Sequence, residues 1–271
     1  MFVGGLALDG LASALQSGAD IVCVDLEDAV PPARKAEARA SVTLAANSLQ
    51  APAHVHLIAR INSLRSLDGL ADLQAMLLQP NAFEGLLLPK VETADEIVWA
   101  ATLMTEAGSS LELYAIIETV QGLDNVMSIA NADPRLRALF FGGFDLSTAL
   151  GCTMAWEPLL YARSRVVHAA ASAQLDAIDS PYPDIDDLNG LHASCEQAKA
   201  LGMTGKSAKH ASQIATIRAV FTPTAEEIAA ARQIIALYDA DPTRPLVHQG
   251  KLIELPAIRR YQRMSNLAIG T

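Results

Sequence analysis

The chain has 271 residues, of which 51% are hydrophobic, 5% aromatic and 18% charged, which is typical of one barrel-sized domain with a large core. Its net charge is −10 and its pI is near 5.0, so the basic surface that proteins use to hold nucleic acid is not expected. The first residues lack the basic start of a signal peptide, and no apolar stretch reaches the roughly 18 residues of a membrane span. We therefore expect a cytoplasmic protein with no nucleic-acid or membrane partner.

Eight runs of β-branched or apolar residues alternate with helical patterns at the interval that repeated βα units require. The runs are Phe2–Val3, Ile21–Leu26, Val55–Ile61, Gly85–Leu88, Leu113–Ile117, Leu139–Phe141, Ala177–Ile178 and Thr204–Ser207. Eight such units predict a (β/α)₈ barrel of parallel strands.

Helix boundary signals lie between several of these runs. Pro31-Pro32 opens an alanine-rich helix, and Thr93 caps a helix that continues to Ala107. Asp187 caps a segment that ends at Leu201-Gly202. These signals place each helix between two predicted strands.

Residues beyond the eighth unit form a separate C-terminal extension. A helix is predicted over Ala225–Tyr238, followed by a turn at Asp241-Pro242, a tail over Leu246–Leu255 and a last helical piece. We therefore divide the chain into a barrel, residues 1–222, and an extension, residues 223–271, that packs on the barrel and on a neighbouring subunit.

Two acidic residues, Glu118 and Asp145, each follow an apolar run that is predicted to be a strand. If those strands are neighbours in one parallel barrel, both carboxylates lie at the carboxyl ends of the strands, where such barrels keep their chemistry. Mg²⁺ takes one or two carboxylates and fills its other positions with water and substrate oxygens. The pair therefore indicates a Mg²⁺ site, although either acid could instead cap the following helix.

Several motifs follow one another along the chain in a distinctive order. They are Val24–Val30, Arg60–Asn62, Leu88–Glu92, the two acidic segments and Gly205–Ile214. In this order they resemble the citrate lyase β-subunit-like proteins of the HpcH/HpaI aldolase superfamily. The resemblance covers nearly the whole chain and implies a modified TIM barrel, Mg²⁺ as cofactor, and a reaction that makes or breaks a carbon–carbon bond between a 2-oxo acid and an acyl-CoA enolate.

This resemblance also implies roles for individual residues. Glu118 and Asp145 are the implied ligands of Mg²⁺. Arg60 is the implied arginine that holds the substrate carboxylate, a task that suits its planar fork of donors. Glu27 and Asp28 are expected to hold metal-bound water or Arg60. Alternatively, Arg60 only forms a salt bridge to Glu27 or Asp28, and the two acids only begin the next helix.

Two further features take their interpretation from the family. Gly142 and Gly143 are expected to let the backbone approach a small anionic substrate, although a tight strand-to-helix turn would also explain them. The tail Gln249–Pro256 resembles the stretch whose acid, usually aspartate, enters the adjacent subunit as the catalytic acid/base. Glu254 stands at that position with one more methylene, and the alternative is a solvated glutamate.

The N-terminal segment departs from the family pattern. Relatives carry a proline and an arginine soon after the glycine of the first strand, whereas this chain has Gly4–Asp9 and no basic residue before Arg34. If the missing arginine contacts the phosphates of coenzyme A, nucleotide binding is weaker here.

We thus predict a Mg²⁺-dependent carbon–carbon lyase that acts on a 3-hydroxyacyl-CoA of the citramalyl-, malyl- or citryl-CoA type. It would give acetyl-CoA and a 2-oxo acid, or run in reverse, as a homotrimer or dimer of trimers. One alternative is a metal-dependent pyruvate-type aldolase that acts on free hydroxy-oxo acids. The other is a non-catalytic binding protein or a subunit of a lyase complex.

Overall fold

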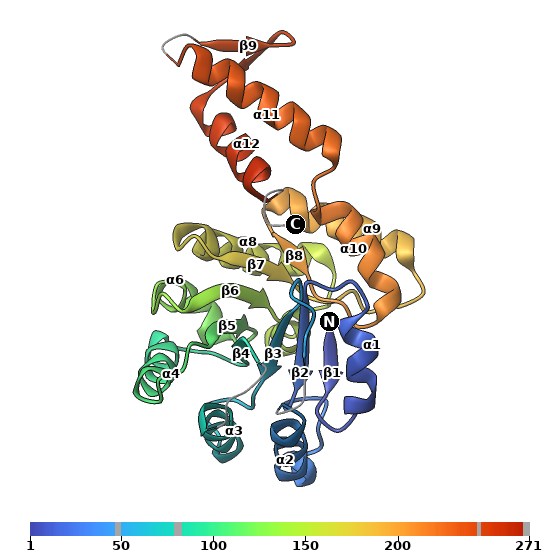
Figure 1. Cartoon of the computed structure of the whole chain (residues 1–271), viewed down its shortest axis with the longest axis vertical. Helices are drawn as coiled ribbons and strands as arrows, with labels where there is room; N and C mark the ends of the chain where they lie inside the picture. The colour runs from blue at the N-terminus through green and yellow to red at the C-terminus, as the bar shows by residue number, and fades with distance from the viewer. Residues whose placement is uncertain (47–49, 79–82, 243–244, 268–271) are drawn as a thin grey trace. The chain divides into compact units, whose positions relative to one another are not determined.

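The computed structural model describes residues 1–46, 50–78, 83–242 and 245–267 (Figure 1). The chain divides into two compact units, Met1–Ala219 and Val220–Thr271. None of the helices in the described ranges is long and apolar enough to cross a membrane.

The first unit is built on one parallel sheet whose strands are hydrogen-bonded in the order of the chain. The strands are β1 (Phe2–Gly4), β2 (Ile21–Asp25), β3 (His56–Arg60), β4 (Gly85–Leu88), β5 (Glu112–Ile117), β6 (Leu136–Phe141), β7 (Asp176–Asp179) and β8 (Gly205–Lys206). Each contains or overlaps one of the eight predicted runs. The modified TIM barrel predicted from the sequence is therefore confirmed.

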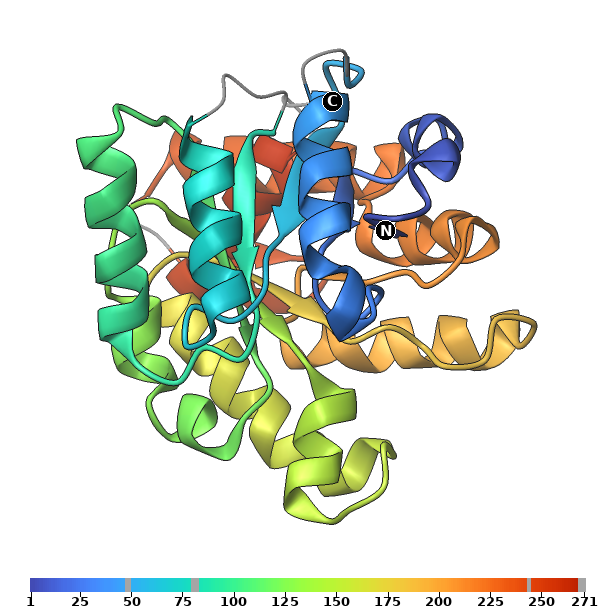
Figure 2. The same cartoon turned by 90° about the horizontal axis from the view of Figure 1, so that it is seen from below.

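Helices connect the strands and lie outside the curled sheet (Figure 2). The longer ones are α2 (Lys35–Ala46), α3 (Leu67–Leu78), α4 (Ala94–Glu106), α8 (Trp156–Ser172) and α9 (Leu188–Leu201). The shorter ones are η1 (Leu8–Gly10), α1 (Leu11–Leu15), η2 (Pro32–Arg34), α5 (Val120–Asp124), α6 (Val126–Ala130), α7 (Gly143–Leu150), η3 (Ala211–Gln213) and α10 (Ile214–Phe221).

The predicted boundary signals act as expected at two of these helices. Thr93 and Glu96 form a reciprocal capping box at the start of α4. The Asp187 carboxylate accepts the Gly190 N–H at 2.8 Å, and α9 ends at Gly202, whose φ of +110° only glycine adopts easily.

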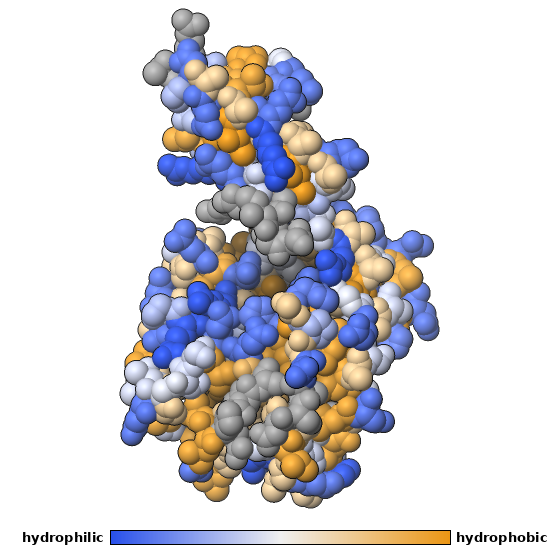
Figure 3. Space-filling model, viewed as in Figure 1, coloured by the Kyte–Doolittle hydropathy of each residue, from blue (hydrophilic) through white to orange (hydrophobic). Residues whose placement is uncertain are grey.

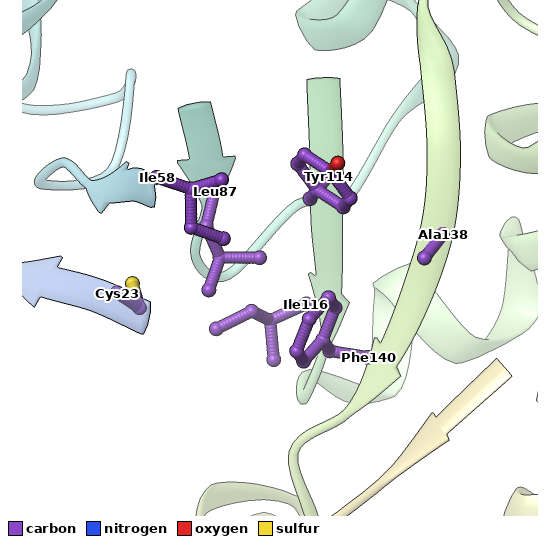
Figure 4. Packing of buried hydrophobic residues seen from close by; sticks show 7 residues of the cluster. All are labelled: Cys23, Ile58, Leu87, Tyr114, Ile116, Ala138 and Phe140. Carbon is purple, nitrogen blue, oxygen red and sulfur yellow. The ribbon is translucent and has the colours of Figure 1, made fainter. Parts of the chain in front are cut away.

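The interior of the sheet is packed with side chains from β2 to β6 (Figure 4). They are Cys23, Ile58, Leu87, Tyr114, Ile116, Ala138 and Phe140. Alternate residues of a strand point to the same face, so the rows that supply Cys23, Ile58 and Ile116 continue to Asp25, Arg60 and Glu118. The strand period thus places these three polar residues directly above the apolar core, at the carboxyl ends of the strands.

The second unit contains α11 (Ala225–Ala240), the antiparallel hairpin of β9 (Leu246–His248) and β10 (Lys251–Ile253), and α12 (Leu255–Leu267). The sequence predicted the first helix but gave the following tail no strands. The two-residue turn of the hairpin consists of Gln249 and Gly250, with φ values of +48° and +73°. A hairpin turn with positive φ at both central residues matches the twist of the flanking strands.

Candidate active site

Arg60 and Asp25 lie opposite each other in the register of β3 and β2. Arg60 donates from Nε to Asp25 Oδ1 at 2.8 Å and from Nη2 to Asp25 Oδ2 at 2.5 Å. Its Nη1 lies 3.1 Å from Glu27 Oε2. Burial acts to lower the pKa of Arg60, but the bonds and charges of Asp25 and Glu27 raise it overall. The guanidinium therefore stays charged and fixed in orientation.

The salt bridge from Arg60 to Glu27, considered as an alternative from the sequence, is present in the structure. A guanidinium carries one N–H on Nε and two on each terminal nitrogen. The hydrogen bonds to Asp25 use Nε and one donor of Nη2, while Nη1 faces Glu27 and, at 3.8 Å, Asp28 Oδ2. These contacts do not use all five donors of Arg60.

Glu118 follows the last residue of β5 and is only 4% exposed. Its Oε1 accepts the main-chain N–H of Lys90 at 2.9 Å. Gly142, just after β6, lies against it: a Cβ on that residue would come within 3.0 Å of Glu118 Cβ and Oε2. The glycine is therefore required for Glu118 to lie where it does.

Asp145 lies in the first turn of α7, close enough to Glu118 for its charge and a side-chain hydrogen bond to act on that carboxyl. Burial first, and then the charge of Asp145, raise the pKa of Glu118 to about 8. The described residues hold no group of three or more His, Cys, Asp or Glu side chains suited to a metal ion. An oxygen-only pair of mutually repelling carboxylates fits Mg²⁺, which keeps most of its positions for water and substrate.

A second layer of charged groups surrounds this pair. Glu27 is buried, and its carboxylate contacts the Lys90 ammonium as well as Arg60. Asp28 is exposed, with Oδ1 at 3.4 Å from Lys90 Nζ. Glu27 thus contacts both Arg60 and Lys90, and Asp28 Oδ2 lies 3.8 Å from Arg60 Nη1. Their expected role in holding metal-bound water stays a prediction.

Counting ionised groups gives the electrostatic character of the site. Its carboxylates are Asp25, Glu27, Asp28, Glu118 and Asp145, and its cations are Arg60 and Lys90. Because the raised pKa of Glu118, about 8, keeps that carboxyl mostly protonated at neutral pH without a metal, four negative charges face two positive ones and two are uncompensated. A divalent cation between Glu118 and Asp145 would offset most of this surplus.

The segment that carries Asp145 is held from β7. Ser180 Oγ accepts the Gly143 N–H at 3.2 Å. Beside it, the fully buried Asp179 binds Arg163 Nε at 2.9 Å and Lys206 Nζ at 2.5 Å. The Arg163 guanidinium stacks on the rings of Phe141 and Trp156 at 4.7 and 4.8 Å. These contacts explain why glycine stands at 143, because a Cβ there would meet Ser180 Oγ at 2.6 Å.

The substrate contacts expected of Gly142 and Gly143 stay predictions. Glu254, the expected acid/base, lies on the second unit between β10 and α12 and is exposed. Its main-chain carbonyl accepts the N–H groups of Ala257 and Ile258, so it starts α12. The structure of one chain does not test its predicted role in a neighbouring site, which also stays a prediction.

Sequence reasoning missed two residues of this site. Asp25 was quoted only as part of a motif, although its carboxylate is the main partner of Arg60. Lys90 likewise appeared only within the Leu88–Glu92 motif, although it contacts Glu27, Asp28 and Glu118. Both bear charge and stand at strand ends, which is the signal that could have identified them.

Residues 1–211 match the family model of the HpcH/HpaI aldolase/citrate lyase proteins. The chain is therefore a member of that family.

Two curated relatives align with more than nine-tenths of the chain. It is 30% identical over 275 residues to the L-malyl-CoA/beta-methylmalyl-CoA lyase of Cereibacter sphaeroides, covering 91% of this chain and 86% of that protein. It is 32% identical over 268 residues to the mitochondrial citramalyl-CoA lyase of Rattus norvegicus, covering 92% and 79% respectively.

Solved structures show the same fold. RipC from Yersinia pestis is 37% identical with a TM-score of 0.73, covering 84% of this chain and 95% of RipC. CitE from Mycobacterium tuberculosis, in complex with magnesium, acetoacetate and coenzyme A, is 27% identical with a TM-score of 0.80. That alignment covers 98% of this chain and 96% of CitE.

Proposed function

We propose that this protein is a Mg²⁺-dependent carbon–carbon lyase that acts on a 3-hydroxyacyl-CoA of the citramalyl-, malyl- or citryl-CoA type. The observation that carries the proposal is the buried Glu118 beside Asp145, with the fixed guanidinium of Arg60 at the same strand ends. The malyl-CoA and citramalyl-CoA lyases among its relatives, and the CitE complex with magnesium and coenzyme A, support the same chemistry.

Glu118 and Asp145 would hold Mg²⁺, which, when bound, polarises the carbonyl of the 2-oxo acid. Arg60 binds the carboxylate of that acid through its Nη1 and Nη2 donors. Asp25 keeps the guanidinium in place during the reaction, since it binds Nε and one donor of Nη2. Glu27 and Lys90 hold each other by an ion pair and so fix the surroundings of Glu118.

In the direction of synthesis, a base must remove a proton from the carbon next to the thioester carbonyl. We assign this role to Glu254 of a neighbouring subunit, on the resemblance of its tail to that of the family. In the direction of cleavage the same group returns a proton to the thioester enolate that is left when the carbon–carbon bond breaks, which gives acetyl-CoA. Gly142 and Gly143 would lie against the small anionic substrate.

The decisive experiment offers citramalyl-CoA and malyl-CoA to the purified protein with and without Mg²⁺. We expect Mg²⁺-dependent release of acetyl-CoA together with pyruvate or glyoxylate, and loss of both products in Glu118→Gln. Turnover of free hydroxy-oxo acids in place of thioesters would instead identify an aldolase. Ligand binding without turnover of either class would identify a binding protein or a lyase subunit.

The aldolase is the second candidate because one observation favours it. The segment that follows β1, Gly5–Asp9, carries no basic residue that could contact the phosphates of coenzyme A. A comparison of dissociation constants for acetyl-CoA and pyruvate would separate the two functions.

We also propose a homotrimer or dimer of trimers in which the extension, residues 223–271, packs on the barrel and on a neighbouring subunit. The second unit exposes Leu237, Val247, Leu252 and Leu255, which are 43 to 63% exposed. Figure 3 shows hydrophobic side chains on the visible face of this unit. Apolar surface of this kind commonly marks an interface, and light scattering measures the assembly.

We also propose the cytoplasm as the location of the protein. The free thiols of Cys23, Cys152 and Cys195 agree with it.

A further inference from the structure

Lys90 has an unusual backbone conformation for a residue with a side chain. It lies between β4 and α4 with a φ of +54°, in the left-handed region that favours glycine. Such a conformation is unfavourable for lysine and persists only where the surroundings impose it. Its position beside the candidate metal site makes it informative.

In this left-handed conformation Lys90 contacts three acids at once. Its main-chain N–H points to Glu118 Oε1 at 2.9 Å, while its ammonium contacts Glu27 and lies 3.4 Å from Asp28 Oδ1. Gly142 and Asp145 also contact Glu118, but in the described ranges the Lys90 N–H is the one main-chain donor found to its carboxylate. The Lys90 N–H therefore determines where one ligand oxygen lies.

Arg65, from the loop between β3 and α3, binds the main-chain carbonyl of Lys90 from the solvent side. It donates from Nη2 to the Lys90 carbonyl at 2.7 Å and forms an ion pair with Glu92. The Glu92 N–H is bound in turn by Glu96 Oε1 at 2.9 Å, in the capping region of α4. The loop is thereby tied to α4.

The other side of the loop is packed against α5. A Cβ on Gly122 would overlap the Val91 carbonyl, so the two backbones are in close contact there. Asn125 Nδ2 donates to the Glu92 carbonyl at 2.8 Å. These contacts fix Val91 and Glu92, but the carbonyl of Lys90 itself depends on Arg65.

We propose that Arg65 is a positioning residue of the metal site: it holds Lys90 in the left-handed conformation and so aims the Lys90 N–H at Glu118. This inference rests on the proposed role of Glu118 as a Mg²⁺ ligand. Without Arg65, Lys90 leaves the left-handed conformation and its N–H turns away from Glu118. Glu118 then loses its main-chain donor, and Mg²⁺ binds less tightly. The donors of Arg60 are unaffected.

The first test measures Mg²⁺ affinity by calorimetry in Arg65→Ala. Outer partners of metal ligands typically contribute about 10- to 100-fold in affinity, and Arg65 acts one contact further away, so we expect a loss of about five- to ten-fold. Arg137→Ala is the matched control, since Arg137 is also an exposed arginine bound to a glutamate, here Glu112 on the adjacent strand. Its Mg²⁺ affinity should stay within about two-fold of wild type.

A double-mutant cycle separates the backbone conformation from the lysine charge. Lys90→Gly and Lys90→Ala both remove the ammonium, but only glycine adopts positive φ without strain. Adding Arg65→Ala should therefore weaken Mg²⁺ binding by about the same five- to ten-fold in the Lys90→Ala background as in wild type. In the Lys90→Gly background the added loss should fall to about two-fold or less.

Three results would overturn the inference. Unchanged Mg²⁺ affinity in Arg65→Ala, while wild type binds Mg²⁺, would refute the role of Arg65 and leave the proposed function standing. Equal effects of Arg65→Ala in the two Lys90 backgrounds would refute the backbone explanation. No Mg²⁺ binding by wild type would refute the metal site and this inference with it.

Discussion

Arg60 has a structural partner in Asp25, and we propose that its remaining donors bind the substrate. Asp25 occupies the Nε edge with bonds of 2.8 and 2.5 Å, and the side chain is only 13% exposed. An ion pair this far from water needs well-oriented hydrogen bonds to offset its desolvation, and Asp25 supplies them. Asp25 itself is held by the N–H groups of Glu27 and Ala29.

Replacement of Arg60 by lysine tests whether the guanidinium donors bind the substrate carboxylate. A single ammonium cannot bind Asp25 and also offer two parallel donors to a substrate. We expect affinity for a 2-oxo acid at saturating Mg²⁺ to fall by about ten-fold or more, since hydrogen bonds to charged groups contribute about 1.5–3 kcal/mol. Affinity for Mg²⁺ should change little. Equal oxo-acid affinities in mutant and wild type would limit Arg60 to structure.

Replacement of Asp145 by asparagine tests the metal pair. The mutant should fold normally, because Asp145 lies in the first turn of α7 and outside the core. Calorimetric titration should show Mg²⁺ affinity reduced by more than about 100-fold, beyond the usual effect of outer partners. Asp95→Asn is the matched control, since Asp95 lies in the first turn of α4. A folded mutant with wild-type Mg²⁺ affinity would remove Asp145 from the site.

At the scale of elements, the site depends on how closely β5 and β6 approach at their ends. Ile117 and Phe141 are partners in register, so Glu118 and Gly142 follow side by side. Gly142→Ala would force a Cβ into Glu118, and overpacking of this kind costs about 1–3 kcal/mol. We expect weaker Mg²⁺ binding and a lower thermal midpoint.

Gly10→Ala is the control for this substitution, because nothing lies within 4 Å of a Cβ at Gly10. It should leave both Mg²⁺ affinity and thermal midpoint close to wild type. Normal Mg²⁺ binding by a stable Gly142→Ala protein would show that Glu118 can move without loss, contrary to our interpretation.

The β7 and β8 ends contribute a buried ion network with no place in the proposed chemistry. Asp179 is fully buried and binds both Arg163 and Lys206. Asp179→Asn leaves these cations without a counter-charge, so we expect the free energy of unfolding to fall by about 3–5 kcal/mol. Denaturant titration measures it. Asp176→Asn, at the exposed start of the same strand, should have little effect; comparable losses in both variants would argue against the network.

The elements show what the sequence could and could not predict. The eight strands were recognised because each has an apolar run, but β6 starts three residues before its predicted run, at Leu136, since the exposed Arg137 interrupts the apolar pattern. The β9–β10 hairpin was missed because its turn, Gln249-Gly250, lacks the usual asparagine or aspartate.

The candidate site was predictable to a similar degree. Glu118 and Asp145 could be paired because both follow strands that are neighbours in the chain. The partnership of Arg60 with Asp25 depends on the register of β2 against β3, which no sequence pattern specifies. The left-handed conformation of Lys90 could not be predicted either, because Arg65 imposes it from another loop.

At the scale of the whole molecule, the proposed role of Glu254 requires a closed ring of subunits. A heterologous interface that closes on itself gives each subunit one composite site. Inactive Glu254→Gln and Asp145→Asn chains, unfolded together and refolded in equal amounts, should therefore recover activity. In random mixing about a quarter of the sites combine an intact metal pair with an intact neighbouring Glu254.

Recovered activity should reach about a quarter of wild type in verified mixed oligomers. Each mutant refolded alone is the control and should stay inactive. If mixed oligomers form and remain inactive, Glu254 acts within its own subunit or outside catalysis.

The surplus of negative charge at the strand ends also has a kinetic consequence. Oxo acids and CoA thioesters are anions, and in the metal-free protein they approach two uncompensated negative charges on a chain whose net charge is already −10. Electrostatic repulsion therefore slows the binding of the substrate until a divalent cation occupies the site. This favours ordered addition, with the metal first. For the metal-free protein added salt should speed substrate encounter by screening the repulsion, the reverse of electrostatic steering.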